Sequence, residues 1–128
     1  MSTAPATMYA ELGGDAAVRA LVDRFYDIMD REPALAPLRA LHGADLAPMR
    51  DKLADFMSAW LGGPQRYFQR PDAVCIGAAH SAFAIDALLR DQWLECMDRA
   101  LAAVGAPAAL QQRIRVPLAE LADFLRNR

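Results

Sequence analysis

Residues 86–105, DALLRDQWLECMDRALAAVG, decide the fold class of this 128-residue chain. Their apolar side chains recur every three or four residues, which is the spacing of one face of an α-helix. They are Leu89, Trp93, Cys96, Met97, Leu101 and Val104. Asp86 stands where such a helix would begin, and Gly105 and Pro107 stand where it would end. The stretch therefore predicts one long helix that buries a single face.

Three other stretches have the same period. One spans about residues 15–30, and a second follows Asp45, the expected N-cap, and runs to Leu61. The last begins near Ala108, and Pro117 is expected to kink or break it. No segment alternates between apolar and polar residues as a half-buried strand does, so the predicted fold class is all-α.

Residues 62–84 differ from the rest of the chain because they contain Gly, Pro and scattered aromatic residues without a sustained period. We expect an irregular connector here, with at most a short helix around His80. Binding and catalytic residues often lie on such segments. The connector is therefore the first place to look for a functional side chain.

Length and composition predict a single domain over residues 9–128, with residues 1–8 as a disordered lead-in. The start of the chain lacks the basic and apolar regions of a secretory signal, and no apolar run is long enough to cross a bilayer, so a cytoplasmic protein is expected. A formal net charge of -2 and the absence of a basic stripe argue against a nucleic-acid partner.

The chain contains two histidines and two cysteines. Taken alone, His80 is either a satisfied, partly buried histidine or a metal ligand, and His42 is a turn residue. A zinc site could combine His42, Cys75, His80 and Cys96, but their spacings match no compact zinc motif. The cysteines are expected to be reduced packing residues in buried or half-buried surroundings.

Several short motifs occur in a fixed order along the chain. They are Leu12-Gly13-Gly14, Phe25-Tyr26, Leu61-Gly62-Gly63-Pro64, His80-x-x-Phe83 and Arg90-Asp91-Gln92-Trp93-Leu94-x-Cys96-Met97. As an ordered set from about Tyr9 to Leu101, they resemble the group II truncated haemoglobins. The resemblance implies a globin-like two-over-two helical sandwich that encloses one haem b.

The resemblance also implies roles for individual residues around that haem. His80 would be the proximal ligand of the iron, with its other ring nitrogen donating to a backbone carbonyl. Tyr26 and Trp93 would donate hydrogen bonds to a ligand on the distal side. His42 would either join these hydrogen bonds or reach the iron as a sixth ligand, and we favour the hydrogen-bonding role.

The pocket walls implied by the resemblance also read as core positions: Phe25, Leu53, Phe56, Met57, Trp60, Phe83, Ile85 and Met97. Lys52, the only lysine, would pair with a haem propionate, and Tyr67 and Arg66 are weaker candidates for the same contact. Two positions depart from the family pattern. Met49 replaces a small distal residue, and Ala79 replaces an arginine before the proximal histidine.

The expected function is therefore reversible binding of dioxygen and related diatomic ligands such as carbon monoxide and nitric oxide. Redox activity on nitric oxide, nitrite or peroxide, fed by an unknown reductase, is the enzymatic extension of this expectation. Several distal donors suit chemistry or sensing better than bulk oxygen transport. The alternative is a haem-free helical interaction or sensor module, and the protein is expected to be a monomer or a homodimer.

Overall fold

The computed structural model describes residues 7–73 and 75–128, and the regular elements in these ranges are all helical. They are α1 (Met8–Leu12), α2 (Asp15–Arg31), η1 (Pro33–Leu35), α3 (Ala36–Ala40), α4 (Ala47–Trp60), α5 (Arg66–Gln69), α6 (Ile76–His80), α7 (Ala87–Ala103) and α8 (Ala108–Leu125). The predicted all-α fold class is confirmed. Within the described ranges, no helix is long and apolar enough to cross a membrane.

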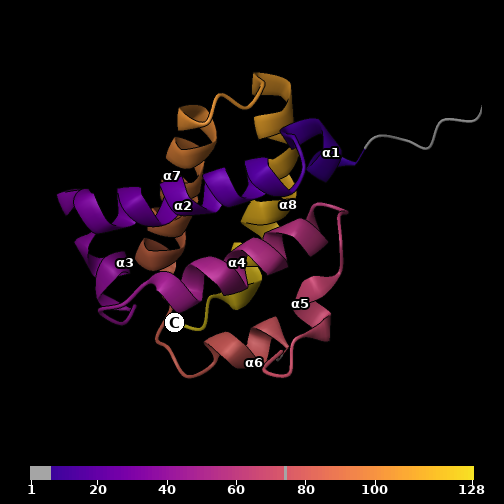
Figure 1. The fold of residues 1–128 in the computed structure, drawn as a ribbon. Helices are drawn as coiled ribbons and strands as arrows, with labels where there is room; N and C mark the ends of the chain where they lie inside the picture. The colour runs from indigo at the N-terminus through magenta and orange to yellow at the C-terminus, as the bar shows by residue number, and fades with distance from the viewer. Residues whose placement is uncertain (1–6, 74) are drawn as a thin grey trace, which may run out of the picture.

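The four longest helices form two layers. Helices α2 and α4 lie against each other, and α7 and α8 form a second pair that runs across them. Figure 1 shows this crossing, with the α7–α8 pair running roughly vertically behind α2 and α4. Helix α2 packs on α7, which joins the two layers. The arrangement is the two-over-two sandwich expected from the sequence.

The core lies where α2 meets α7 and α8. Leu21 and Val22 of α2 are completely buried, as are Met97 of α7 and Ile114 of α8. These residues occupy the apolar stripes of their helices, so their burial follows from helical periodicity. Because the two layers share one core, they form a common frame for anything that binds between them.

A tight turn after α4 ties the start of the chain to the sandwich. Gly62 has a φ of +96°, a left-handed conformation that favours glycine. A Cβ atom at Gly63 would collide with the ring of Tyr9. The amide of Tyr9 also donates to the carbonyl of Leu61 at 3.0 Å. The two glycines therefore let α1 pack closely against the end of α4.

Two predictions about helix ends need correction. Helix α1 begins at Met8, because the Thr7 hydroxyl accepts from the amide of Ala10 at 3.0 Å and caps it. Of the lead-in predicted over residues 1–8, residues 7 and 8 belong to the cap and first turn of α1, and residues 1–6 lie outside the described part. Pro117 does not break α8, which continues to Leu125 with the proline in its interior. Leu118, just after the proline, is buried in the core and holds the helix in place.

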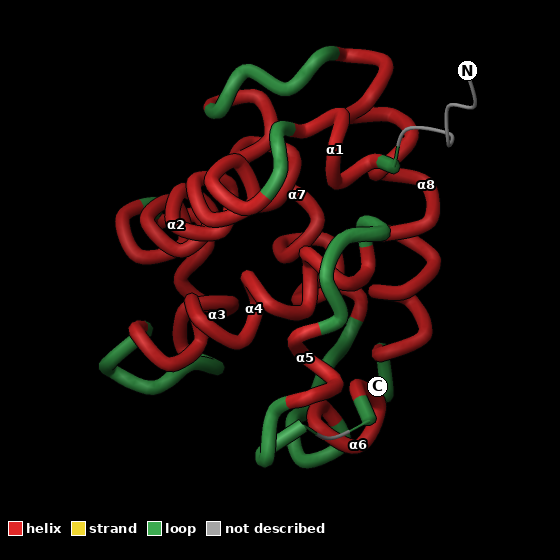
Figure 2. The backbone as a smooth tube through the Cα atoms, turned by 45° about the vertical axis from the view of Figure 1, so that its right-hand side comes forward, coloured by secondary structure: helices red, strands yellow, loops and turns green. Residues whose placement is uncertain are grey.

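The connector between α4 and α7 is irregular, as predicted, but it contains α5 in addition to the short helix that ends at His80. Figure 2 shows α5 and α6 as short red segments separated by green loops. Neither short helix contains a buried residue. Cys75, which precedes α6, is exposed, and this corrects the prediction that it is buried or half-buried.

Candidate functional site

A cavity of about 390 Å³ is lined by side chains from both helical layers and from the connector. This volume lies within the range of small-molecule and cofactor sites, about 300–1,000 Å³. Most residues predicted for the site line it: Tyr26, His42, Met49, Lys52, Leu53, Phe56, Met57, Tyr67, His80, Phe83, Ile85 and Trp93. The structure thus brings together residues that are up to 67 positions apart, as between Tyr26 and Trp93.

His80 is the last residue of α6, and its ring is held in one orientation. Its Nδ1 lies 2.7 Å from the carbonyl oxygen of Ile76, four residues earlier in the helix. A carbonyl oxygen only accepts, so Nδ1 carries the hydrogen, and in the neutral ring Nε2 keeps its lone pair. The ring is therefore in the tautomer that a metal ligand needs, with the supporting hydrogen bond that fixes such ligands.

Tyr26 lies on α2 and is only 2 % exposed. Its ring meets Phe25 edge to face at a centroid distance of 5.0 Å. No hydrogen bond to its hydroxyl is found within the described residues, yet none of their buried polar side-chain atoms lacks a partner. The hydroxyl must therefore be reachable from the cavity that Tyr26 lines. Burial raises the pKa of Tyr26 well above its usual value, so the hydroxyl remains a donor.

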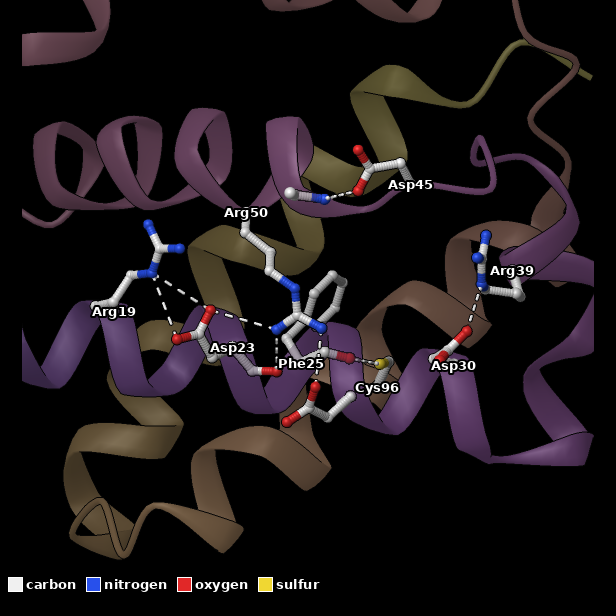
Figure 3. A network of polar contacts seen from close by, with 10 residues as sticks. Arg19, Asp23, Phe25, Asp30, Arg39, Asp45, Arg50 and Cys96 are labelled. Atoms are coloured by element: carbon white, nitrogen blue, oxygen red, sulfur yellow. Dashed lines mark hydrogen bonds and ion pairs between the residues drawn. The ribbon is translucent and has the colours of Figure 1, made fainter.

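Arg50 of α4 holds the helix that carries Tyr26. Its guanidinium donates to Asp27 at 2.8 Å and to the backbone oxygen of Asp23 at 3.0 Å, both on α2. The guanidinium also lies over the Tyr26 ring at 5.8 Å from its centroid. Figure 3 shows Arg50 reaching from α4 to the acidic side chains of α2. This network fixes the spacing of α2 and α4 next to the cavity.

His42 follows α3 and is anchored by its neighbours. Its Nδ1 lies 3.0 Å from the carbonyl oxygen of Leu38, so Nδ1 carries the hydrogen and Nε2 does not. Burial lowers the pKa of His42, which keeps the ring neutral. In this state Nε2 accepts a hydrogen bond or binds a metal, but it does not donate. Hydrogen bonding to a bound ligand was the favoured role of His42. If His42 were the donor in that bond, Nε2 would have to be protonated, which burial opposes.

Arg39 holds the segment that carries His42. It pairs with Asp30 of α2 at 2.9 Å, a contact drawn in Figure 3. The same guanidinium donates to the carbonyl oxygens of Gly43 at 2.9 Å and Ala44 at 3.2 Å. Arg39 therefore ties the turn after α3 to α2, and the His42 ring lies near Tyr26 with a centroid distance of 6.0 Å.

Trp93 of α7 faces the cavity next to α2. Its ring lies 5.3 Å from that of Phe25, at an interplanar angle of 60°. The preceding residue, Gln92, accepts from the amide of Leu38 at 3.1 Å and donates to the carbonyl oxygen of Ala34 at 3.2 Å. Gln92 therefore joins α7, which carries Trp93, to η1 and to α3, the helix that precedes His42.

Basic side chains lie at one edge of the cavity. Lys52 of α4 pairs with Asp72 at 3.4 Å, and Arg70 pairs with the same carboxylate at 3.0 Å and with Asp55 at 2.7 Å. The Arg70 guanidinium, followed by Lys52, lowers the pKa of Asp72. Arg70 was not among the predicted site residues, although it lines the cavity beside Lys52.

Some predicted residues do not reach the cavity wall. Phe25 and Met97 are completely buried in the core behind it, and Trp60 packs partly buried against that core. Their apolar stripes include both core and cavity positions, which spacing alone does not distinguish. Arg66 pairs with Asp15 at 2.6 Å instead of lining the cavity.

Other lining residues were missed. Leu118, Leu121 and Leu125 of α8 line the cavity, as do Leu38 and Leu41 around α3. The α8 residues had a signal, because their helical spacing marks them as inward-facing. That signal could not show whether they faced other side chains or a cavity.

The zinc alternative finds no support in the described part of the chain, where no group of three or more His, Cys, Asp or Glu residues could hold a metal ion. Cys96 is buried, and its thiol donates to the carbonyl oxygen of Phe25 at 3.2 Å. Burial raises the pKa of Cys96 to about 12, so it remains protonated. Cys75, in contrast to Cys96, is exposed.

The lining fits a flat, largely apolar group that contains one metal ion. Leu53, Phe56 and Met57 supply apolar walls, His80 supplies an imidazole whose Nδ1 is held by Ile76, and Lys52 supplies a cation at the edge. Haem would present the matching chemistry, with an apolar macrocycle, an iron that takes a histidine nitrogen, and acidic propionates. The residues present therefore fit haem.

Comparison with known proteins identifies the family. A model of the bacterial-like globins matches residues 7–127. The structure of a group II two-on-two haemoglobin from Agrobacterium tumefaciens is 38% identical, with a TM-score of 0.92 over 99% of this chain and 98% of that one. This chain belongs to the bacterial-like globins, in the group II truncated haemoglobins.

Two further relatives agree. A cold-adapted truncated haemoglobin from Pseudoalteromonas haloplanktis is 33% identical and gives a TM-score of 0.91 over 96% of this globin and 99% of that chain. A group 2 truncated haemoglobin of Bacillus subtilis is 30% identical over 99 residues, which are 77% of this globin and 73% of the relative. Membership of this family implies haem-based binding of small ligands.

Proposed function

We propose that this globin binds haem b through Nε2 of His80 and binds dioxygen and related diatomic ligands between the haem and Tyr26. The observation that carries the proposal is the 2.7 Å bond from Nδ1 of His80 to the Ile76 carbonyl oxygen, at the wall of a cavity that Tyr26 also lines. Haem held by His80 would supply an iron that binds small ligands.

The distal side chains would select and retain the ligand. Bound dioxygen carries partial negative charge, which a fixed donor in a dry pocket stabilises. The Tyr26 hydroxyl is such a donor because it is buried, protonated and without a partner in the described residues. The indole N–H of Trp93 is a second donor at the same cavity. Carbon monoxide is less polar, so it should gain less from both.

His42 would act in a different way. Because its Nδ1–H is directed to Leu38, its other nitrogen accepts, and a protonated ligand such as a peroxide is a suitable donor. This neutral nitrogen is the feature that favours redox activity on peroxide, since it can take up a proton from the substrate. Nitric oxide and nitrite are further substrates in the proposal, with an unidentified reductase as electron source and a cytoplasmic location.

Lys52 and Arg70 would hold the haem propionates. Both lie at the cavity, and both now share the Asp72 carboxylate, which has the same chemistry as a propionate. Met49, 36 % exposed at the cavity, would narrow ligand entry from the distal side.

The absorption spectrum of the purified protein tests the proposal. The ferric, ferrous and carbon monoxide forms should each show a Soret band, and His80→Gly should lose the wild-type spectrum. Added imidazole should restore it in His80→Gly, because free imidazole can occupy the vacated position. An unchanged spectrum and haem affinity in His80→Gly would overturn the assignment. A colourless protein that takes up no haemin would instead support the haem-free interaction module.

A further inference from the structure

The helix that carries the predicted haem ligand is weakly anchored by packing. Helix α6 is five residues long and contains no buried residue. The segment from Ser81 to Asp86 that follows it has no regular secondary structure. It has no helical hydrogen bonds of its own to fix its conformation, so contacts with other segments hold it in place. The position of His80 depends on how this segment is held.

Asn127 supplies most of these partners. Its side-chain oxygen accepts from the amide of Ile85 at 2.8 Å, and its side-chain nitrogen donates to the carbonyl oxygen of Phe83 at 2.7 Å. The backbone amides of Asn127 and Arg128 both donate to the carbonyl oxygen of Ile85, at 2.9 and 3.0 Å. We call this set of four hydrogen bonds the Asn127 clasp.

The clasp connects two parts of the cavity wall. Phe83 and Ile85 on one side line the cavity, as does Leu125, two residues before Asn127 on the other. In Figure 1 and Figure 2 the C-terminus lies beside the segment that joins α6 to α7. A fifth contact reinforces the junction, because Arg90 of α7 pairs with Asp123 of α8 at 2.6 Å.

The clasp is also linked to His80 along the backbone. The amide of Phe83 donates to the carbonyl oxygen of His80 at 3.0 Å, which closes the turn after α6. The carbonyl oxygen of the same Phe83 receives the Asn127 side chain. Phe83 thus connects His80 to Asn127, because its amide bonds to one and its carbonyl oxygen to the other. A shift of Phe83 would move the end of α6.

We propose that Asn127 is a positioning residue for the haem group, which holds segment 83–85 and thereby sets the position of His80 in the cavity. This inference rests on the proposed binding of haem at His80. Asparagine suits the task because its short side chain has both a donor and an acceptor, whereas aspartate only accepts and alanine does neither. The two side-chain bonds reach backbone groups two residues apart.

The test compares holoprotein variants by haem loss to excess apomyoglobin and by the iron–histidine stretching band of the ferrous form. Asn127→Ala removes both side-chain bonds and should release haem about tenfold faster, a change that corresponds to about 1.4 kcal/mol. Asn127→Asp keeps the size of the side chain but places an acceptor against the Phe83 carbonyl oxygen, so it should be at least as damaging. Both variants should shift or broaden the iron–histidine band.

Gln111→Ala is the matched control. Gln111 lies on α8, whereas Asn127 follows that helix, but like Asn127 it holds a loop with its amide nitrogen, which donates to the carbonyl oxygen of Ala106 at 2.7 Å. Ala106 does not line the cavity. This variant should lower the urea midpoint while leaving the haem-loss rate within twofold of wild type and the iron–histidine band unchanged.

The outcomes separate this inference from the proposed function. If His80→Gly loses haem but both Asn127 variants keep the wild-type band and haem-loss rate, the clasp has no positioning role and the inference is wrong. If the Asn127 variants change only the urea midpoint, as Gln111→Ala does, the role is merely structural and the inference also fails. If wild-type protein binds no haem, the proposed function fails first.

Discussion

Replacing Tyr26 with phenylalanine removes one hydroxyl from the cavity and leaves the rest of the ring in place. The edge-to-face contact with Phe25 and the cation–π contact with Arg50 use the ring, so both remain. The hydroxyl has no hydrogen-bond partner in the described part of the chain, so folding should lose little. We expect the free energy of unfolding to change by less than about 1 kcal/mol.

Ligand release should respond much more strongly. A hydrogen bond to a charged group contributes about 1.5–3 kcal/mol, and dioxygen bound next to Tyr26 would carry part of such a charge. At about 1.4 kcal/mol per tenfold, Tyr26→Phe should speed dioxygen release by about ten- to hundredfold. Stopped-flow displacement of dioxygen by carbon monoxide measures this rate directly.

Carbon monoxide provides the internal control for this variant, because it is less polar and should leave at nearly the wild-type rate. Trp93→Phe, which removes the second donor, should raise the dioxygen rate in the same direction. The reasoning is refuted if dioxygen release from Tyr26→Phe stays within threefold of wild type. It is refuted equally if both gases speed up by the same factor, since that would indicate a wider cavity.

Three further changes test other parts of the structure. Asp72→Asn should slow haem loss to apomyoglobin at low ionic strength, because it frees Lys52 and Arg70 for the propionates. A haem-loss rate in this variant that is the same at low and at high salt would argue against this. Met97→Ala should lower the free energy of unfolding by about 2–5 kcal/mol, measured by urea titration, because it opens a hole in the buried core. Burial lowers the pKa of His42 in the folded state, so the unfolded chain binds more protons between that pKa and 6.5. The stability that neutral His42 contributes is therefore present above pH 6.5 and is lost as the pH falls from 6.5 towards the folded-state pKa. The urea midpoint should therefore drop less between pH 7.5 and pH 5.5 in His42→Gln than in wild type, and equal drops would contradict the assignment.

Local patterns predicted the helices well because each buries one apolar stripe. The first and third long helices, α2 and α7, match the expected spans to within one residue at most ends. Asp45 was expected to be the N-cap of the second, but the N-cap of α4 is Leu46, and the Asp45 carboxylate accepts from the amide of Ala47 at 3.0 Å from one position earlier. Pro117 does not break α8 because the cost of a proline is local, whereas the burial of Leu118 depends on the whole fold.

The site was less predictable where it depends on contacts between distant residues. Order and identity of motifs placed Tyr26, His80 and Trp93, and all three line one cavity. The sequence could not indicate that the Leu38 carbonyl would fix the tautomer of His42, because that depends on the geometry of the turn after α3. Asn127 was also invisible, since its partners lie more than forty residues earlier in the chain.

The separate anchoring of the two cavity walls affects how this globin can diverge. Arg39 and Gln92 hold the His42 side, whereas Asn127 holds the His80 side, and the two sets of contacts share no residue. Substitutions on one side can therefore accumulate without disturbing the other. A lineage could change the His42 side through α2 and the turn after α3 while it keeps the His80 side unchanged, so the two sides of the cavity can evolve independently.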